Sequence, residues 1–205
     1  MRLRSGADTL RGASKTVYFA TTNRGKFIEA TQVASRFGIR LKQLRVEKLE
    51  IQSNDLEVIA SFAAVWAARS KKCPVVAEDA GFFLKSLGGF PGPYSSYVFK
   101  TLGTSGILRL MKNAKNRRAS FRAAVAFCTP KTRPWCFTGV VEGRVSRVAR
   151  GTHGFGFDPI FIPRKGDGRT FAEMATEEKN ALSHRAMAFA SFLRWFKAEQ
   201  KRLSG

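Results

Sequence analysis

A short apolar run passes directly into a helical pattern near the start of the chain, in the segment VYFATTNRGKFIEA at residues 17–30. Residues 17–20 are bulky and apolar, as in a buried strand, and residues 25–37 place apolar side chains at helical spacing. Thr21, Thr22 and Asn23 lie between them, where capping and turn residues are favoured. A strand that enters a helix through so short a turn indicates an α/β unit.

The same alternation continues along the chain. Further strands are predicted at 39–51, 73–79, 119–128 and 134–148, and further helices at 55–70, 103–113 and 184–202. Between them, residues 81–98 are rich in glycine and proline and predict a helical turn followed by a constrained loop. The two later strands have no helix between them, which adds an antiparallel part. The predicted fold class is therefore α/β, with a mixed, partly antiparallel central sheet flanked by helices.

Length and composition favour one domain. A chain of 205 residues with 44% hydrophobic residues can bury one sizeable core, and we assign residues 16–205 to it. Residues 1–15 are predicted to be a flexible basic extension, because they lack the apolar stretch of a signal peptide. The three cysteines show no C-x-x-C spacing, and no apolar run reaches transmembrane length, so we expect a cytoplasmic protein.

The charge balance is strongly basic. The chain has 36 lysines and arginines against 15 acidic residues, a formal net charge of +21. Such an excess favours polyanionic partners, namely nucleotides, nucleic acid or an acidic membrane surface. It is equally compatible with a basic proteome or a role in solubility. Charge alone does not choose among these interpretations.

The turn at residues 21–26 is a candidate anion site without being a P-loop. Ala20 stands where the first glycine of the P-loop pattern belongs, and Phe27 follows Lys26. A helix N-terminus still presents backbone N–H groups that attract anions, and Lys26 adds a positive charge. The alternative is an ordinary capped helix with a surface lysine.

Two adjacent carboxylates, Glu78 and Asp79, end the predicted strand CPVVAED. Ligand sites in open α/β sheets lie at such strand ends, and neighbouring strand residues point to opposite faces. One of the two acids could bind Mg²⁺ or accept a proton from water. Glu50, which ends the preceding predicted strand, could supply a second oxygen. The alternatives are a turn acid for the pair and a solvated side chain for Glu50.

Two further segments carry candidate ligand-binding side chains. The loop GTHGFGFDP has aromatic residues beside flexible backbone, where a base can stack, although such aromatics more often belong to the core. The segment before the last helix is rich in cations, and an arginine there could donate to carbonyl oxygens, although solvated charges are the commoner case. The candidates are Phe155, Gly156, Phe157, Asp158, Lys179, His184 and Arg185.

Together, ATTNRGKFIEA, VVAEDAGFFLKSLGGFPGPYS, GFGFDPIFIP and TFAEMATEEKNALSHRAMA resemble the motifs of the inosine/xanthosine triphosphate pyrophosphatases, archaeal members in particular. The four motifs occur in the family's order and span about residues 16–200. The resemblance implies a two-lobed fold with the active site in the cleft between lobes, and a homodimer. It also implies Mg²⁺-dependent hydrolysis of the noncanonical purine nucleotides ITP, dITP and XTP to the monophosphate and pyrophosphate.

The resemblance assigns a role to each matching residue. Asp79 matches the family's general base, and Glu50 and Asp79 match its metal-binding acids. The substrate-binding matches are Thr21, Thr22, Asn23 and Lys26 for the triphosphate, Phe155, Gly156, Phe157 and Asp158 for the base, and Lys179, His184 and Arg185 for both.

Two positions depart from the family's pattern. Thr22 replaces a common glycine in the phosphate turn, and Ala80 replaces a common serine after Asp79. Two other interpretations stay open on sequence grounds. One is a related pyrophosphatase acting on modified or pyrimidine nucleotides, and the other is a basic nucleic-acid-binding module without activity.

Overall fold

The computed structural model describes residues 16–46 and 51–204. The predicted extension at 1–15 and the candidate ligand Glu50 lie outside these residues. The described chain divides into two compact units. Unit 1 comprises residues up to Asp79, 124–138 and those from Met187 onward, and unit 2 comprises 80–123 and 139–186.

The strands form one mixed sheet, which confirms the predicted fold class. In the described residues the order of the path is β2-β1-β3-β5-β6-β7, with β4 paired to β3. The pairs β1–β2 and β1–β3 are parallel, whereas β3–β4 and β6–β7 are antiparallel. The strands are β1 (Thr16–Ala20), β2 (Arg40–Leu44), β3 (Val75–Leu84), β4 (Pro91–Gly92), β5 (Arg118–Cys128), β6 (Trp135–Val145) and β7 (Phe161–Pro163).

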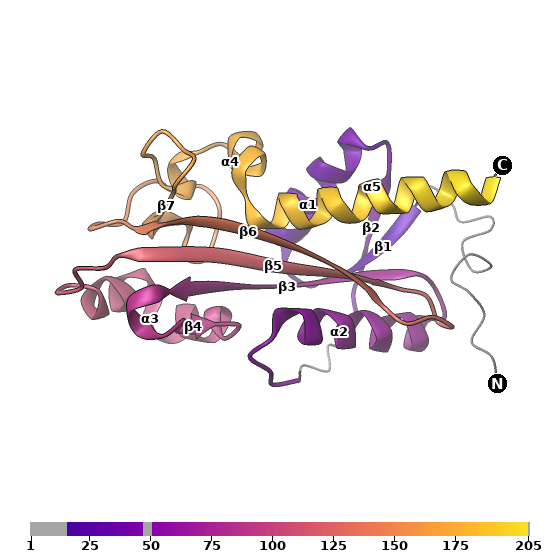
Figure 1. Cartoon of the computed structure of the whole chain (residues 1–205), viewed down its shortest axis with the longest axis horizontal. Coiled ribbons are helices and arrows are strands. Elements are labelled where there is room, and N and C mark those ends of the chain that lie inside the picture. Colours follow the sequence, from indigo (N-terminus) through magenta and orange to yellow (C-terminus); the bar gives the residue numbers. More distant parts are fainter. Residues whose placement is uncertain (1–15, 47–50, 205) are drawn as a thin grey trace. The chain divides into compact units, whose positions relative to one another are not determined.

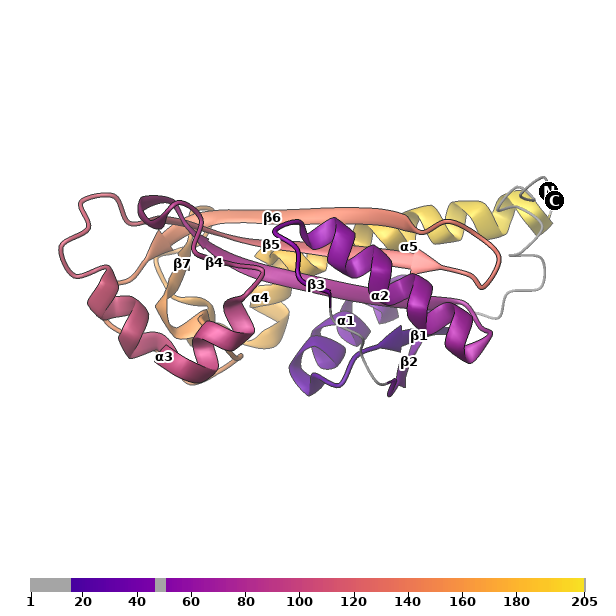
Figure 2. The same ribbon diagram turned by 90° about the horizontal axis from the view of Figure 1, so that it is seen from below.

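The helices are α1 (Arg24–Arg36), α2 (Leu56–Lys71), α3 (Ser95–Leu110), α4 (Thr176–Leu182) and α5 (His184–Ser204). In unit 1, α2 and α5 cover opposite faces of the sheet, as the two perpendicular views agree (Figures 1 and 2). Phe19 of β1 packs against Phe27 of α1 and Phe189 of α5, so α1 and α5 share a face. Small buried alanines on α2, including Ala60, Ala64 and Ala67, let that helix approach the other face closely.

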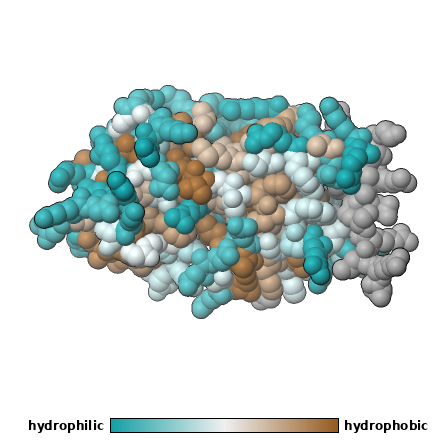
Figure 3. Space-filling view, in the orientation of Figure 1, coloured by the Kyte–Doolittle hydropathy of each residue, from teal (hydrophilic) through white to brown (hydrophobic). Residues whose placement is uncertain are grey.

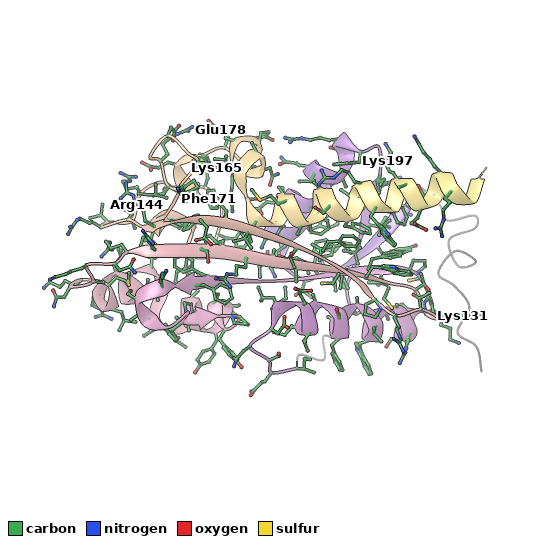
Figure 4. All side chains as sticks on the ribbon, in the orientation of Figure 1. Lys131, Arg144, Lys165, Phe171, Glu178 and Lys197 are labelled. Atoms are coloured by element: carbon green, nitrogen blue, oxygen red, sulfur yellow. The ribbon has the colours of Figure 1, made fainter. Side chains whose placement is uncertain are left out.

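Unit 2 has a core of its own, built largely from phenylalanines. Phe82 of β3 packs against Phe121 of β5 at 4.7 Å between ring centroids, and Phe121 packs against Phe161 of β7 at 4.8 Å. Aromatic pairs at this separation add packing energy to the area they bury. Phe157, which precedes β7, and Phe171, which follows it, also belong to this cluster. Phe171 is labelled in Figure 4.

Two elements differ from the sequence prediction. The strand predicted at 73–79 runs to Leu84, because the residues after Gly81 stay extended and Phe82 and Phe83 pair with β4. The helix predicted at 103–113 begins at Ser95 and is kinked at Gly103, whose φ of +61° interrupts the helical backbone. Glycine adopts this left-handed conformation without a side-chain clash. The other predicted elements are present, with β2 shorter than expected.

The cysteines and the lengths of the helices bear on two further features of the chain. Cys73, Cys128 and Cys136 are free thiols, and burial raises the pKa of Cys136 to about 11. None of the helices in the described part of the chain is both long and apolar enough to cross a bilayer.

Candidate active site

The turn between β1 and α1 is held by its own side chains. The Oγ1 of buried Thr21 accepts a hydrogen bond from the backbone N–H of Asn23 at 3.1 Å. Asn23 is the N-cap of α1, and its Oδ1 accepts from the N–H of Lys26 at 3.0 Å. Thr22 is exposed, so its side chain remains available to a ligand. The structure thus places all four predicted turn residues around one helix N-terminus, which favours anions.

Lys26 and Glu78 form the main electrostatic contact of this turn. The Nζ of Lys26 lies 2.7 Å from Oε2 of Glu78, whose side chain is fully buried. A buried carboxylate is stable only with such a partner, because its removal from water is costly. The contact fixes the lysine ammonium next to the turn, and sequence patterns alone did not predict it.

Glu78 and Asp79 lie within β3 rather than at its end. The parallel pairing of β1 with β3 nevertheless stops at Ala20 and Ala77, immediately before the two acids. They therefore lie at the carboxyl edge of the parallel part of the sheet, where α/β proteins bind ligands. The prediction that the two acids end the strand is therefore wrong, because β3 continues to Leu84, although the acids do lie where its parallel pairing stops.

The Asp79 carboxylate fits part of a magnesium site. The described residues contain no group of three or more histidines, cysteines or acids that could hold a metal by themselves. Mg²⁺, however, is commonly held by one or two carboxylates together with substrate phosphates. Asp79 supplies a hard oxygen donor of this kind next to a turn suited to phosphate, whereas the carboxylate of Glu78 is buried against Lys26.

In unit 2, the loop at residues 151–158 is folded around Asp158. The Oδ2 of this buried carboxylate accepts the N–H of Phe155 at 2.8 Å and lies 2.5 Å from the Nζ of Lys179. Gly154 has a φ of +72°, and a Cβ there would collide with the same carboxylate. The carboxylate of Asp158 is therefore engaged by the protein, which gives it a role in holding the loop.

The two aromatic residues of this loop have different surroundings. Phe157 is buried and stacks on Phe82 at 5.2 Å, so it belongs to the core of unit 2. Phe155 stays partly exposed, with the Nζ of Lys179 at 4.9 Å and the guanidinium carbon of Arg185 at 5.3 Å from its ring centroid. Cations over an aromatic face are attracted by its negative quadrupole. Only Phe155 is placed to stack on a ligand.

The start of α5 brings the remaining predicted residues together. Ser183 caps the helix by accepting the N–H of Ala186 at 3.1 Å. His184 and Arg185 are both buried, and the His184 ring stacks on Phe121 at 4.9 Å. Lys179, His184 and Arg185 are thus buried groups rather than solvated surface charges. Buried cations are uncommon unless they are paired or serve a ligand.

Two residues that were not predicted also belong to this region. Asn180 is buried beside Lys179 in the sequence, and Gly154 is required by the packing of Asp158. The glycine could have been suspected from its place in a glycine-rich loop, whereas nothing in the pattern marks Asn180. Ala80, the residue after Asp79, is half-buried and adds no polar group.

The fold and these residues define an α/β protein with a turn suited to anions, acidic residues where the parallel pairing of its sheet ends, and an aromatic loop packed against the cations Lys179 and Arg185. The model of the Ham1 family matches residues 17–195. The chain belongs to the Ham1 family.

Relatives and solved structures agree with this membership. The dITP/XTP pyrophosphatase of Methanopyrus kandleri is 48% identical over 181 residues, covering 88% of this chain and 96% of that protein. The protein of the same name from Pyrococcus horikoshii is 47% identical over 185 residues, covering 90% and 98%. The structure of a HAM1 protein from Coxiella burnetii is 27% identical with a TM-score of 0.79, covering 89% and 98%. The predicted family of nucleoside triphosphate pyrophosphatases is thereby confirmed.

Proposed function

We propose that this protein hydrolyses ITP, dITP and XTP to the nucleoside monophosphate and pyrophosphate in a Mg²⁺-dependent reaction. The observation that carries the proposal is the Lys26–Glu78 pair beside the anion-binding turn, next to Asp79, in a chain whose relatives are named dITP/XTP pyrophosphatases. The biological role that follows is removal of these nucleotides from the nucleotide pool.

In unit 1, the turn at 21–26 would bind the triphosphate. The backbone N–H groups at the start of α1, the exposed Thr22 hydroxyl and the Lys26 ammonium are all donors. Thr22 thus offers a hydroxyl where the family commonly has glycine. Asp79, with Glu50, would hold Mg²⁺, which neutralises phosphate charge when it is bound.

Asp79 would act as the general base. It accepts a proton from the water that attacks the α-phosphorus, a new P–O bond forms, and the bond from the α-phosphorus to the bridging oxygen breaks. Pyrophosphate leaves with the electron pair of that bond. Fixed charges such as Lys26 stabilise the charge that develops on the leaving group.

In unit 2, the loop and the start of α5 would bind the base. Hypoxanthine and xanthine carry a carbonyl at position 6, whereas adenine carries an amine. The guanidinium of Arg185 can only donate hydrogen bonds. It can therefore bond to the 6-carbonyl of hypoxanthine or xanthine but not to the 6-amine of adenine, which is also a donor. Phe155 offers a ring on which the base can stack, and Asp158 and Lys179 hold that ring in place.

Pyrophosphate release from ITP, XTP, dITP, GTP, ATP and dUTP, each with Mg²⁺ and with EDTA, tests the proposal. We expect release mainly from ITP, XTP and dITP, and none in EDTA. Release mainly from dUTP or another pyrimidine would instead favour the related pyrophosphatase. A folded sample that releases pyrophosphate from none of these nucleotides would contradict the proposed activity.

We also propose a cytoplasmic homodimer. The exposed apolar side chains on and before α3, among them Tyr94, Tyr97 and Leu102, are the surface best suited to a second copy. Light scattering coupled to size exclusion gives the mass directly. A mass near the 22.7 kDa of one chain would contradict the dimer.

A further inference from the structure

Unit 2 contains an open groove that the proposed active site does not use. The groove has a volume of about 1180 Å³ and is lined by residues near the end of β3, the start of β5, the end of β6, and β7 with the loop after it. Every lining residue belongs to unit 2. None of the residues assigned above to triphosphate, metal or base lines it.

On β5 and β6, the charged residues that line the groove alternate with residues of the phenylalanine core. Along β5, Ala119 and Phe121 belong to the core and alternate with Arg118, Ser120 and Arg122, which line the groove; Ala119 also borders it. The same alternation holds on β6, where Val141 and Val145 belong to the core and Glu142 and Arg144 line the groove. Strand geometry therefore gathers these cations on one face.

The groove is strongly positive. Its lining contains five cationic side chains and one acidic side chain, Glu142; the cations are Lys85, Arg118, Arg122, Arg144 and Arg164. All five are exposed, and within the described part of the chain none of them forms an ion pair with a carboxylate. The pKa of nearby Arg117 is lowered, first by burial and then by the positive charges of Arg147 and Arg144. Like charges are thus crowded here without compensation by the protein.

An aromatic platform lies among these charges. The guanidinium carbon of Arg122 is 4.5 Å from the ring centroid of Phe83, and its Nε donates to Ser120 Oγ at 3.2 Å. The guanidinium is therefore held over the ring. A stacked guanidinium plane can carry a nucleobase on its outer side.

These features fit an extended polyanion better than a small one. A site for a single phosphate or nucleotide normally surrounds its ligand with buried, convergent polar groups. Here the charges are exposed on flexible side chains along an open groove, which is the pattern of backbone contacts to nucleic acid. The aromatic platform favours unpaired bases, since the bases of a duplex are already stacked on one another.

We propose that this groove binds single-stranded nucleic acid, with Arg118, Arg122 and Arg144 contacting phosphates and the Arg122–Phe83 pair stacking on a base. Binding is independent of base sequence and depends strongly on salt. It is a second property of the chain, separate from nucleotide hydrolysis.

Fluorescence anisotropy of a labelled 15-mer of thymidine, titrated with the full chain at several NaCl concentrations, tests this proposal. Each phosphate contact on a single strand contributes about 0.7 to the slope of log K against log salt. The triple variant Arg118→Gln/Arg122→Gln/Arg144→Gln should therefore lower the magnitude of that slope by about 2. The double variant Arg118→Gln/Arg144→Gln keeps the Arg122–Phe83 pair, in case loss of that pair unfolds unit 2. This variant should lower the magnitude of the slope by about 1.4.

A charge-matched control separates the groove from net charge. Lys71→Gln/Lys131→Gln/Lys197→Gln removes three exposed cations from unit 1 and should keep the wild-type slope (Figure 4 labels Lys131 and Lys197). The groove variants should also release pyrophosphate from ITP at the wild-type rate. Equal slope changes in the control and groove variants would overturn the proposal. So would tighter binding of a duplex, displacement by millimolar inorganic pyrophosphate at constant ionic strength, or no binding at 50 mM NaCl.

Discussion

Asp79 and Glu78 are adjacent carboxylates with different surroundings. Glu78 is buried against Lys26, whereas Asp79 is partly exposed at the point where parallel pairing ends. We expect Asp79→Asn to lower the rate of pyrophosphate release about 10²- to 10⁴-fold, the usual contribution of a general base. Steady-state rates with saturating ITP and Mg²⁺ measure this loss.

A matched control is Asp55→Asn, an equivalent change at the N-cap of α2. Asparagine caps a helix as well as aspartate does, so this variant should keep the wild-type rate and melting temperature. An Asp79→Asn variant that retains most of the activity would remove Asp79 as the base. A loss of the near-UV circular dichroism signal in that variant would instead indicate a structural role.

Arg185 is the residue expected to read position 6 of the base. It is buried at the start of α5 with its guanidinium over Phe155. Arg185→Ala should reduce the ratio of kcat/KM for ITP to that for ATP at least about tenfold, the effect of one lost hydrogen bond of roughly 1.4 kcal/mol. Arg194→Ala, an exposed change on the same helix, should leave the ratio unaltered. If both variants keep the wild-type ratio, selectivity has another source.

At the scale of elements, the loop at 151–158 depends on one glycine. A Cβ at Gly154 would meet the Asp158 carboxylate, which pairs with buried Lys179, whereas Gly156 has open space around it. Gly154→Ala should lower the free energy of unfolding by about 3 kcal/mol or more, since it disturbs a buried ion pair. Gly156→Ala should cost only about 1–2 kcal/mol, for its left-handed backbone. Urea unfolding compares the two, and equal losses would contradict this account of the loop.

Arg169 joins the segment after β7 to the start of α4. Its guanidinium donates to Asp167 at 2.8 Å and to both carboxylate oxygens of Glu178, at 2.7 and 3.2 Å (Figure 4 labels Glu178). Hydrogen bonds from Arg169 lower the pKa of both carboxyls. For Asp167 the largest cause is the hydrogen bond from the backbone N–H of Arg169, and for Glu178 it is the hydrogen bond from the Arg169 side chain.

The ion pairs of Arg169 with Asp167 and Glu178 predict that the stability of the folded state depends on pH in the acid range. A carboxyl whose pKa is lowered by folding stabilises the folded state above its unfolded pKa, near 3.8 for Asp167 and 4.5 for Glu178. That stability is lost as the pH falls through the lowered values. Arg169→Gln should therefore shrink the drop in melting temperature between pH 6 and pH 3, whereas Arg164→Gln, at an exposed arginine that has no ion pair among the described residues, should not. An unchanged drop in Arg169→Gln would exclude the pair as a source of acid sensitivity.

For the whole molecule, the alternation of strand and helix patterns was enough to predict the fold class and most elements. It was wrong about the length of β3 and the start of α3, because pairing with β4 and a kink at Gly103 depend on residues distant in the sequence or on backbone dihedrals.

The site was predictable to the level of its residue types and not of their contacts. Phe155 and Phe157 flank the same glycine, and only the packing of unit 2 decides that one is buried and the other is partly exposed. The Lys26–Glu78 pair joins residues that are far apart in sequence, so no spacing rule could have found it. The resemblance to a family supplied the roles that local patterns left open.

The net charge of +21 sets a further property of the whole molecule. Cations outnumber acids by 36 to 15, and hydrophilic residues cover much of the face shown in Figure 3. Such an excess destabilises the compact state through self-repulsion, which salt screens over a Debye length of about 10 Å at 0.1 M. Raising NaCl from 20 to 300 mM at pH 7 should increase the melting temperature by about 3 °C, the shift that roughly 1 kcal/mol produces in a chain of this size. At pH 10, where lysines begin to lose their charge, the increase should be smaller. A melting temperature that falls with salt at pH 7 would show that attractive pairs outweigh the repulsion.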